Sequence, residues 1–198
     1  MRNKGARGLS LAEIIVAMAL LGFLISISSY IFVSAWRRYH VSNALQDVQF
    51  NAVRGVDLFS LDLTETSFSN VSTTRPNTWT FPSARDLSGI FHSTETGPLW
   101  SSWYIYHLVP DGQRKAADGS SLYFLARTQV EGDLYATFSV DTEIARKPYR
   151  VMARNVKRVQ VEVLPLTTYY KIRMETENDI RGKPCTFNAQ RDVVVHSP

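Results

Sequence analysis

The chain has 198 residues, enough for one membrane anchor and one globular domain of modest size. Charged residues make up 20% and aromatic residues 12%, which favours a folded, β-rich domain over a disordered tail. The net charge is +4, but three of the positive charges lie within the first eight residues, so the bulk composition is not that of a strongly basic nucleic-acid binder. A single cysteine excludes an internal disulfide and leaves the redox compartment open.

The chain begins with a short basic leader, MRNKGARG, and continues into a long apolar run. Residues 14–36 carry no charge and are long enough to cross a bilayer as one helix. One carboxylate, Glu13, stands immediately before this run. Because an acid in a membrane helix is costly, Glu13 is expected to need a partner.

Three interpretations of residues 7–36 compete. A cleaved secretory signal would have an apolar region of 7–15 residues, and Val33-Ser34-Ala35 would serve as its cleavage site. The apolar run is too long for that class, and an acid in front of it is atypical. A plain membrane anchor explains the length of the run but neither Glu13 nor Gly8.

The third interpretation is a family resemblance. The sequence GLSLAE at residues 8–13, between a basic leader and a long apolar run, resembles the prepilin signature of type IV pilins and type II secretion pseudopilins. The resemblance implies that a prepilin peptidase cuts after Gly8 and that Leu9, where the family usually has phenylalanine, is N-methylated. Gly22 matches a common family glycine, and Tyr30 stands where many major pilins have a proline, so no helix break is expected there.

In that family the glutamate that corresponds to Glu13 is thought to pair with the N-terminal amine of a neighbouring subunit during assembly. Cleavage would create an ammonium on Leu9, and a cation makes a buried carboxylate tolerable. The helix dipole also favours an acid in the first turn. The alternative is that Glu13 is an interfacial acid near the lipid headgroups.

Orientation follows from the basic residues. Three precede the apolar run, and Arg37 and Arg38 follow it, a small excess that agrees with a cytoplasmic leader. The resemblance implies a single-pass protein of the bacterial inner membrane with its C-terminal domain outside the cytoplasm.

The helical pattern continues beyond Trp36. Apolar residues recur at spacings of three and four: Val41, Leu45, Val48, Ala52, Val56, Phe59 and Leu63. Charged residues lie off this stripe: Arg38, Asp47, Arg54, Asp57 and Asp62. Gly55 is a tolerated weak point, and no proline interrupts the chain before Pro76. One helix from about Leu9 to Thr64, on the order of 80 Å long, is predicted, apolar all round in its first half and amphipathic in its second.

The remainder of the chain predicts short strands. After a Ser, Thr, Asn and Pro-rich loop at 67–78, the candidates are 79–82, 103–109, 121–128, 134–141, 156–164, 168–175 and 192–196. Asp111-Gly112 and Asp118-Gly119 are expected to bracket a hairpin loop. The predicted fold is α+β, with the long N-terminal helix packed on an antiparallel sheet. The expected organisation is a cleaved leader 1–8, a transmembrane assembly helix 9–36, its amphipathic continuation 37–66 and a β-rich domain 67–198.

Weaker similarities connect the domain to J-type minor pseudopilins and related minor pilins. Residues 59–63 with the loop that follows resemble the end of the helix in those proteins, and residues 151–163 resemble their later helix-turn and strand.

No motif indicates catalysis, and we expect the protein not to be an enzyme. His40, His92, His107 and His196 have no metal-ligand spacing, and no serine or cysteine nucleophile signature is present around Cys185 or elsewhere. Glu175, Glu177 and Asp179 are weak candidates for calcium ligands, an ion known in the pseudopilin family, although a solvated strand end explains them as well.

A basic run is the remaining candidate site. Six basic residues and no acid lie between Ile144 and Val161: Arg146, Lys147, Arg150, Arg154, Lys157 and Arg158. Such a patch suits phosphates of DNA or lipid headgroups, but the same pattern describes a solvated strand face or a subunit contact.

Two functions remain open. In the first, the chain is a minor pilin or pseudopilin whose partners are the prepilin peptidase, other pilin subunits, the inner-membrane assembly platform and lipid. In the second, it is a single-span anchored protein whose outer domain binds DNA or a glycan through a stacking surface built from Trp79, Trp100, Trp103, Tyr104 and Tyr106. Those aromatic residues also suit the core and rim of a sheet.

Overall fold

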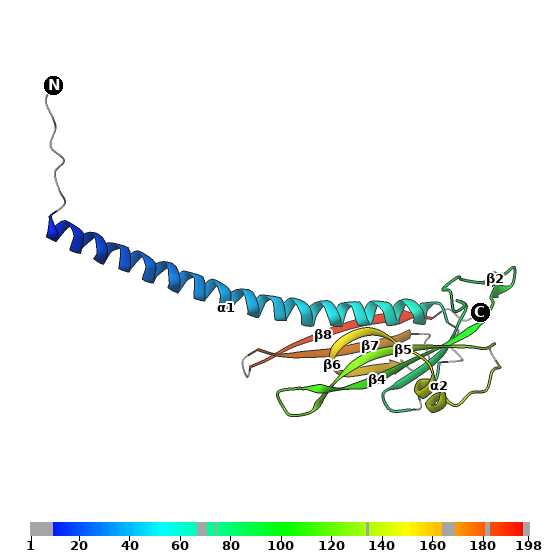
Figure 1. The fold of residues 1–198 in the computed structure, drawn as a ribbon. Coiled ribbons are helices and arrows are strands. Elements are labelled where there is room, and N and C mark those ends of the chain that lie inside the picture. The colour runs from blue at the N-terminus through cyan, green and yellow to red at the C-terminus, as the bar shows by residue number, and fades with distance from the viewer. Residues whose placement is uncertain are drawn as a thin grey trace, which may run out of the picture. The chain divides into compact units, whose positions relative to one another are not determined.

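The computed structural model describes residues 10–66, 71–73, 75–133, 135–163, 169–180 and 183–195. The chain forms two compact units, Met1–Asn43 and Ala44–Pro198. A 54-residue helix, α1 (Leu11–Thr64), supplies the described helical part of the first unit and continues into the second. The predicted long helix is therefore confirmed over the residues described (Figure 1).

A six-stranded antiparallel sheet makes up most of the second unit. Its strands follow the order β1-β4-β5-β6-β7-β8, so that all neighbours except β1 and β4 are joined in sequence order. Their bounds are β1 (Thr78–Ser83), β4 (Ser102–Lys115), β5 (Ser121–Glu131), β6 (Arg150–Val163), β7 (Tyr169–Ile180) and β8 (Lys183–Val194). A separate two-stranded sheet is formed by β2 (Ser93–Thr94) and β3 (Gly97–Pro98). The α+β fold class is confirmed.

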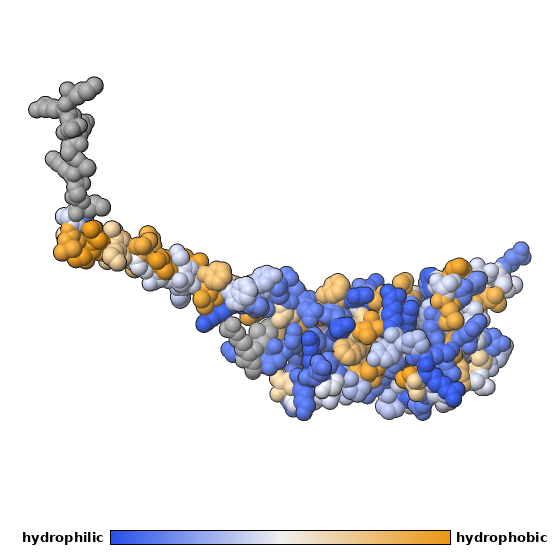
Figure 2. Space-filling model, viewed as in Figure 1, coloured by the Kyte–Doolittle hydropathy of each residue, from blue (hydrophilic) through white to orange (hydrophobic). Residues whose placement is uncertain are grey.

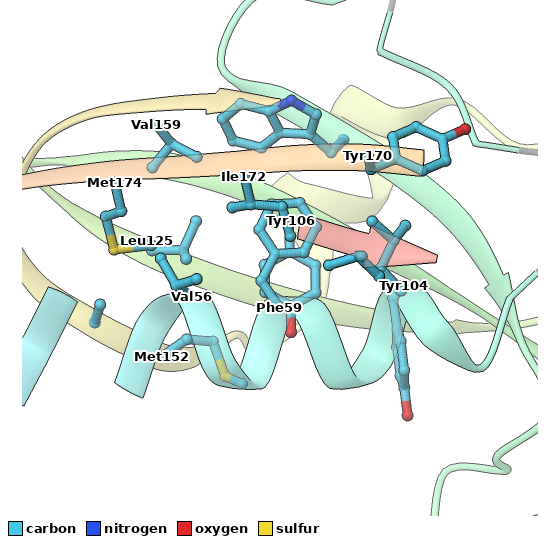
Figure 3. Packing of buried hydrophobic residues seen from close by; sticks show 14 of the residues in the cluster. Val56, Phe59, Tyr104, Tyr106, Leu125, Met152, Val159, Tyr170, Ile172 and Met174 are labelled. Atoms are coloured by element: carbon cyan, nitrogen blue, oxygen red, sulfur yellow. The ribbon is translucent and has the colours of Figure 1, made fainter. Parts of the chain in front are cut away.

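The main core lies between the second half of α1 and one face of this sheet. Five residues of the predicted stripe are buried: Val48, Ala52, Val56, Phe59 and Leu63. Phe59 stacks on Tyr106 with ring centroids 4.3 Å apart and also lies against Phe81 (Figure 3). Val41 and Leu45, the first two members of the stripe, are exposed.

Two residues that follow the last turn of α1 bond to β1 and to the chain that follows it. The Thr66 hydroxyl donates a hydrogen bond of 2.7 Å to the Pro82 carbonyl. Glu65 accepts two bonds from the Arg85 guanidinium, at 2.7 and 2.8 Å. These contacts fix where the helix stops relative to the sheet edge.

The opposite face of the sheet is partly covered by a second, short helix, α2 (Val140–Arg146), and its flanking residues (Figure 1). Trp103 contacts Phe138 and His107 contacts Tyr149, with ring centroids 5.6 and 5.9 Å apart. Because side chains alternate along β4, Trp103 and His107 lie on the face opposite Tyr104 and Tyr106.

Two local predictions were wrong. The strand predicted at 134–141 is absent over its described residues; the chain there is a turn and an irregular segment that enters α2. Asp141 and Glu143 in the first turn and Arg146 in the last suit a helix dipole, which outweighs the short apolar alternation. Asp111-Gly112 lies within β4, where the pairing register shifts between Pro110 and Lys115, and the turn is made by Ala116–Ser120.

The predicted strand at 192–196 was too short, because β8 already begins at Lys183; His196 lies outside the described residues. As an edge strand, β8 leaves most of its side chains exposed, so its first half lacks the apolar alternation that marks a buried strand.

Asp62 is also placed differently from its prediction. It lies off the apolar stripe in sequence, but the structure buries it against the sheet. Its Oδ2 accepts hydrogen bonds of 2.5 Å from the Tyr106 hydroxyl and from Arg127 Nη1. The Arg127 guanidinium in turn lies 4.4 Å from the Tyr104 ring centroid. The helix is thus joined to the sheet by a charged network as well as by apolar packing.

Asp62→Ala should leave the largely buried Arg127 side chain without its counter-charge. We expect a loss of about 3–5 kcal/mol in the free energy of unfolding, measured by denaturant titration of the full chain in non-ionic detergent. Replacing all three polar partners together, as Asp62→Leu with Arg127→Met and Tyr106→Phe, should recover most of this loss. Asp57→Ala is the matched control, because Asp57 pairs with Arg191 at the exposed surface and such pairs contribute roughly 0–1 kcal/mol. Equal losses for Asp57→Ala and Asp62→Ala would contradict the assignment.

Gly55→Ala tests how closely α1 approaches the sheet. A Cβ atom at Gly55 would lie 2.8 Å from the Ala153 Cβ and 2.7 Å from the Met174 Sδ. Overpacking costs about 1–3 kcal/mol, which should exceed the ~1 kcal/mol that alanine gains over glycine in a helix. We expect a lower melting temperature for Gly55→Ala, whereas Gln49→Ala, at an exposed position of the same helix, should leave it unchanged or raised.

Candidate functional site

The apolar part of α1 in the first unit is the leading candidate site. Its large apolar side chains are exposed on all sides: Leu11, Ile14, Ile15, Val16, Met18, Leu20, Leu21, Phe23, Leu24, Ile25, Ile27, Ile31, Phe32 and Val33. Each would gain roughly 1.5–3 kcal/mol on full burial. The segment is long and apolar enough to cross a membrane, and none of its most apolar stretch is buried within the chain (Figure 2).

A capping box opens the helix. The Ser10 backbone N–H donates to Glu13 Oε2 at 2.8 Å, and the Glu13 N–H donates to Ser10 Oγ at 3.2 Å. This reciprocal pair satisfies two of the backbone donors that a helix start leaves open. Glu13 is therefore held within its own first turn. Gly8 and Leu9, the predicted cleavage and methylation sites, lie outside the described residues.

The partnership of Ser10 and Glu13 was not predicted from the sequence. The signal was nevertheless present, because serine followed three residues later by glutamate before an apolar run is the sequence signature of a capping box.

Aromatic and basic residues gather where the apolar run ends. Trp36 stacks with Phe32 at a centroid distance of 6.2 Å and contacts the edge of His40 at 4.7 Å. Tyr39 joins this cluster at 6.4 Å from Trp36. Tryptophan and tyrosine concentrate at the headgroup level of membranes, and basic residues such as the neighbouring Arg37 and Arg38 also suit that level.

The structure distributes the basic run over two elements. Arg146 and Lys147 lie on α2 and its C-terminal cap, and the other four lie on β6. Lys147 pairs with Glu143 at 3.3 Å, and Arg154 lies over the Phe124 ring at 5.5 Å. Arg158 lines a polar cleft together with Gln160, Arg173, Glu175, Asn188 and Gln190.

Lys157 belongs to the acidic cluster rather than to a free cationic surface. Its Nζ bonds Glu177 at 2.8 Å, pairs with Asp118 at 3.0 Å and lies 3.9 Å from Glu175. The hydrogen bonds of Lys157 to Glu177 and Asp118 hold its pKa above its usual range.

The three weak calcium candidates lie on β7. Glu177 is buried; one carboxylate oxygen faces Lys157, and the other accepts the Ala117 N–H at 2.6 Å. Asp179 is exposed. Within the part of the chain that the structure describes, no three His, Cys, Asp or Glu side chains gather as a metal-binding group.

The described histidines have separate environments. His40 belongs to the aromatic cluster on α1, His92 bonds Asp86 at 2.9 Å, and His107 is buried beneath Tyr149. The single cysteine, Cys185, is half-buried on β8.

The aromatic residues of the predicted stacking surface are mostly inside. Trp79, Tyr104 and Tyr106 are buried, and the Trp103 indole N–H donates to the Asp133 carbonyl at 2.8 Å. They form core and rim of the sheet, as their alternative interpretation predicted.

Comparison of the chain with models of protein families, with curated proteins and with solved structures finds no match. The architecture itself is pilin-like: a long N-terminal helix, apolar in its first half, packs through its second half on an antiparallel sheet.

The pKa of His107 gives a prediction for pH dependence. Burial holds this pKa below the usual value of 6.5. Because the unfolded chain takes up the proton more readily, the contribution of neutral His107 is complete above pH 6.5 and is lost as the pH falls below it. The melting temperature of the wild-type protein should therefore fall from pH 7 to pH 5. In His107→Phe, which keeps an aromatic ring beneath Tyr149, the fall should be smaller; an equal fall would contradict this role.

Proposed function

We propose that the protein is a structural minor subunit of a type IV pilus-like or type II secretion pseudopilus filament. The observation that carries this proposal is the fully exposed apolar segment of α1, with one acid in its first turn and a pilin-like domain built on the same helix. An apolar helix of this length needs lipid or other helices around it. In a filament subunit the helix contacts both in turn. It lies in lipid while it anchors the protein in the membrane, and it contacts other helices once it joins the helical bundle of the filament.

The proposal assigns a role to each part of the chain. Residues 1–8 are a cytoplasmic leader that a prepilin peptidase removes, and Leu9 is the N-methylated first residue of the mature protein. Residues 9–36 anchor the protein in the inner membrane and assemble, 37–66 carry the domain, and 67–198 form the domain outside the cytoplasm. The partners are other pilin or pseudopilin subunits and the assembly platform in the membrane. No catalytic role is proposed.

Glu13 is the assembly residue of this proposal. Cleavage after Gly8 would place an ammonium on the residue before Ser10. The Glu13 carboxylate already accepts a hydrogen bond from the Ser10 N–H. An oppositely charged neighbour makes a carboxylate in lipid far less costly. The same carboxylate is therefore suited to accept either its own helix N-terminus or the ammonium of an adjacent subunit.

Processing is tested by the mass of the mature protein purified from its own host. The expected mass is that of residues 9–198 with one added methyl group. Gly8→Ala should block cleavage and leave the leader attached, whereas Gly5→Ala, a glycine change within the same leader, should be processed normally. An intact Met1, or an N-terminus at Trp36, would overturn the proposal.

Assembly is tested separately by photocrosslinking through a benzophenone maleimide attached to a single introduced cysteine in a Cys185→Ser background. Leu20→Cys should crosslink to neighbouring apolar helices, and adding Glu13→Val should lower the crosslinked fraction without preventing insertion or cleavage. A monomeric anchored binding protein would give no crosslinks through the apolar segment.

A further inference from the structure

A pocket in the second unit lies where β6 begins. Its volume is about 560 Å³, within the range of small-molecule sites. It is lined by one residue of the β1–β4 connection, by β5 and by the chain that leads from α2 into β6: Leu87, Arg127, Gln129, Lys147, Pro148, Tyr149 and Arg150.

One wall of the pocket is apolar. Leu87 and Tyr149 are 59% and 45% exposed, and Pro148 lies between Tyr149 and Lys147 in the chain. The Tyr149 ring is held edge-on against buried His107 at 5.9 Å, so its orientation is set by the sheet beneath it. An exposed apolar wall with a fixed ring gains from contact with the apolar part of a ligand.

The charged lining of the pocket has one sign. Arg127 is compensated by Asp62 and Lys147 by Glu143, at N–O distances of 2.5 and 3.3 Å. Arg150 is exposed, and its guanidinium has no hydrogen bond or ion pair with any described residue. It therefore keeps a full charge and all its donors available for an anion.

Two other clefts on the domain have acidic residues in their lining. The polar cleft beside Arg158 includes Glu175, and the groove between α1 and β8 includes Asp57 and Asp192. The pocket at the start of β6 has no acidic residue in its lining. Of these three clefts, it is therefore the one whose charged lining favours an anion.

We propose that this pocket binds a small amphiphilic carboxylate, a molecule that joins an apolar body to one carboxylate group. Arg150 pairs with the carboxylate, and Leu87 and Tyr149 contact the apolar body. Gln129 is not free to take part, because its amide already donates to the Asp86 carbonyl at 2.8 Å and to Ser102 Oγ at 3.0 Å. The site does not depend on filament assembly.

The test uses 4-phenylbutyrate as the probe and the full chain in lipid nanodiscs, with empty nanodiscs as the blank. Saturation-transfer difference NMR should give binding to the wild-type protein above the blank. The uncharged 4-phenylbutanamide should bind about tenfold more weakly, as expected for the loss of one charge-assisted pair. Arg150→Gln should reduce affinity for the carboxylate about tenfold and leave that for the amide nearly unchanged.

Two further variants make the result specific. Tyr149→Ala should weaken both probes, because it removes the apolar wall. Arg158→Gln, an exposed arginine on the same strand outside the pocket, should change neither. The proposal fails if no binding exceeds the blank, if carboxylate and amide bind equally, or if Arg158→Gln matches the effect of Arg150→Gln. Circular dichroism of each variant separates loss of binding from loss of fold.

Discussion

The close packing of α1 on the sheet is the interaction on which the domain depends. Without an internal disulfide, the domain has to be held by its core, and one helix supplies a whole side of that core. Gly55 lets the helix approach until a Cβ would collide with Ala153. Phe59 then lies flat on Tyr106, and Asp62 reaches both Tyr106 and Arg127 one turn later. A change at any of these positions disturbs the others, because all depend on the same helix-to-sheet distance.

The first half of the same helix lies in a different environment from the second half. In its first half, no side chain of the apolar stretch is buried within the chain, so nothing in the described fold explains why those residues are apolar. Only lipid or another apolar surface does. The helix also begins with a capping box, in which the side chains of Ser10 and Glu13 each accept the backbone N–H of the other residue. The acid beside the apolar run is thus a structural part of the helix start.

Sequence periodicity was reliable where one pattern dominated. The long helix and the buried stripe from Val48 to Leu63 follow from spacing alone, because burial on one face requires that spacing. The edge strand β8 and the bulged part of β4 were misjudged, since exposed or irregular strands need no apolar alternation. Asp62 could not be placed from spacing either, because its burial depends on Arg127, which lies 65 residues away in the chain.

Among the candidate sites, too, some residues could be identified from local sequence and others depend on tertiary contacts. Glu13 was identifiable because local signals, a leader and an apolar run, frame it. The basic run between Ile144 and Val161 was visible in the sequence, but its chemistry depends on distant partners. Glu177 compensates Lys157, whereas Arg150, beside Tyr149, has no counter-ion among the residues that the structure describes. A charged side chain is available to a ligand where no oppositely charged side chain of the fold pairs with it. By that criterion Arg150 differs from Lys157, although the two look equivalent in the sequence, and the difference arises from tertiary pairing alone.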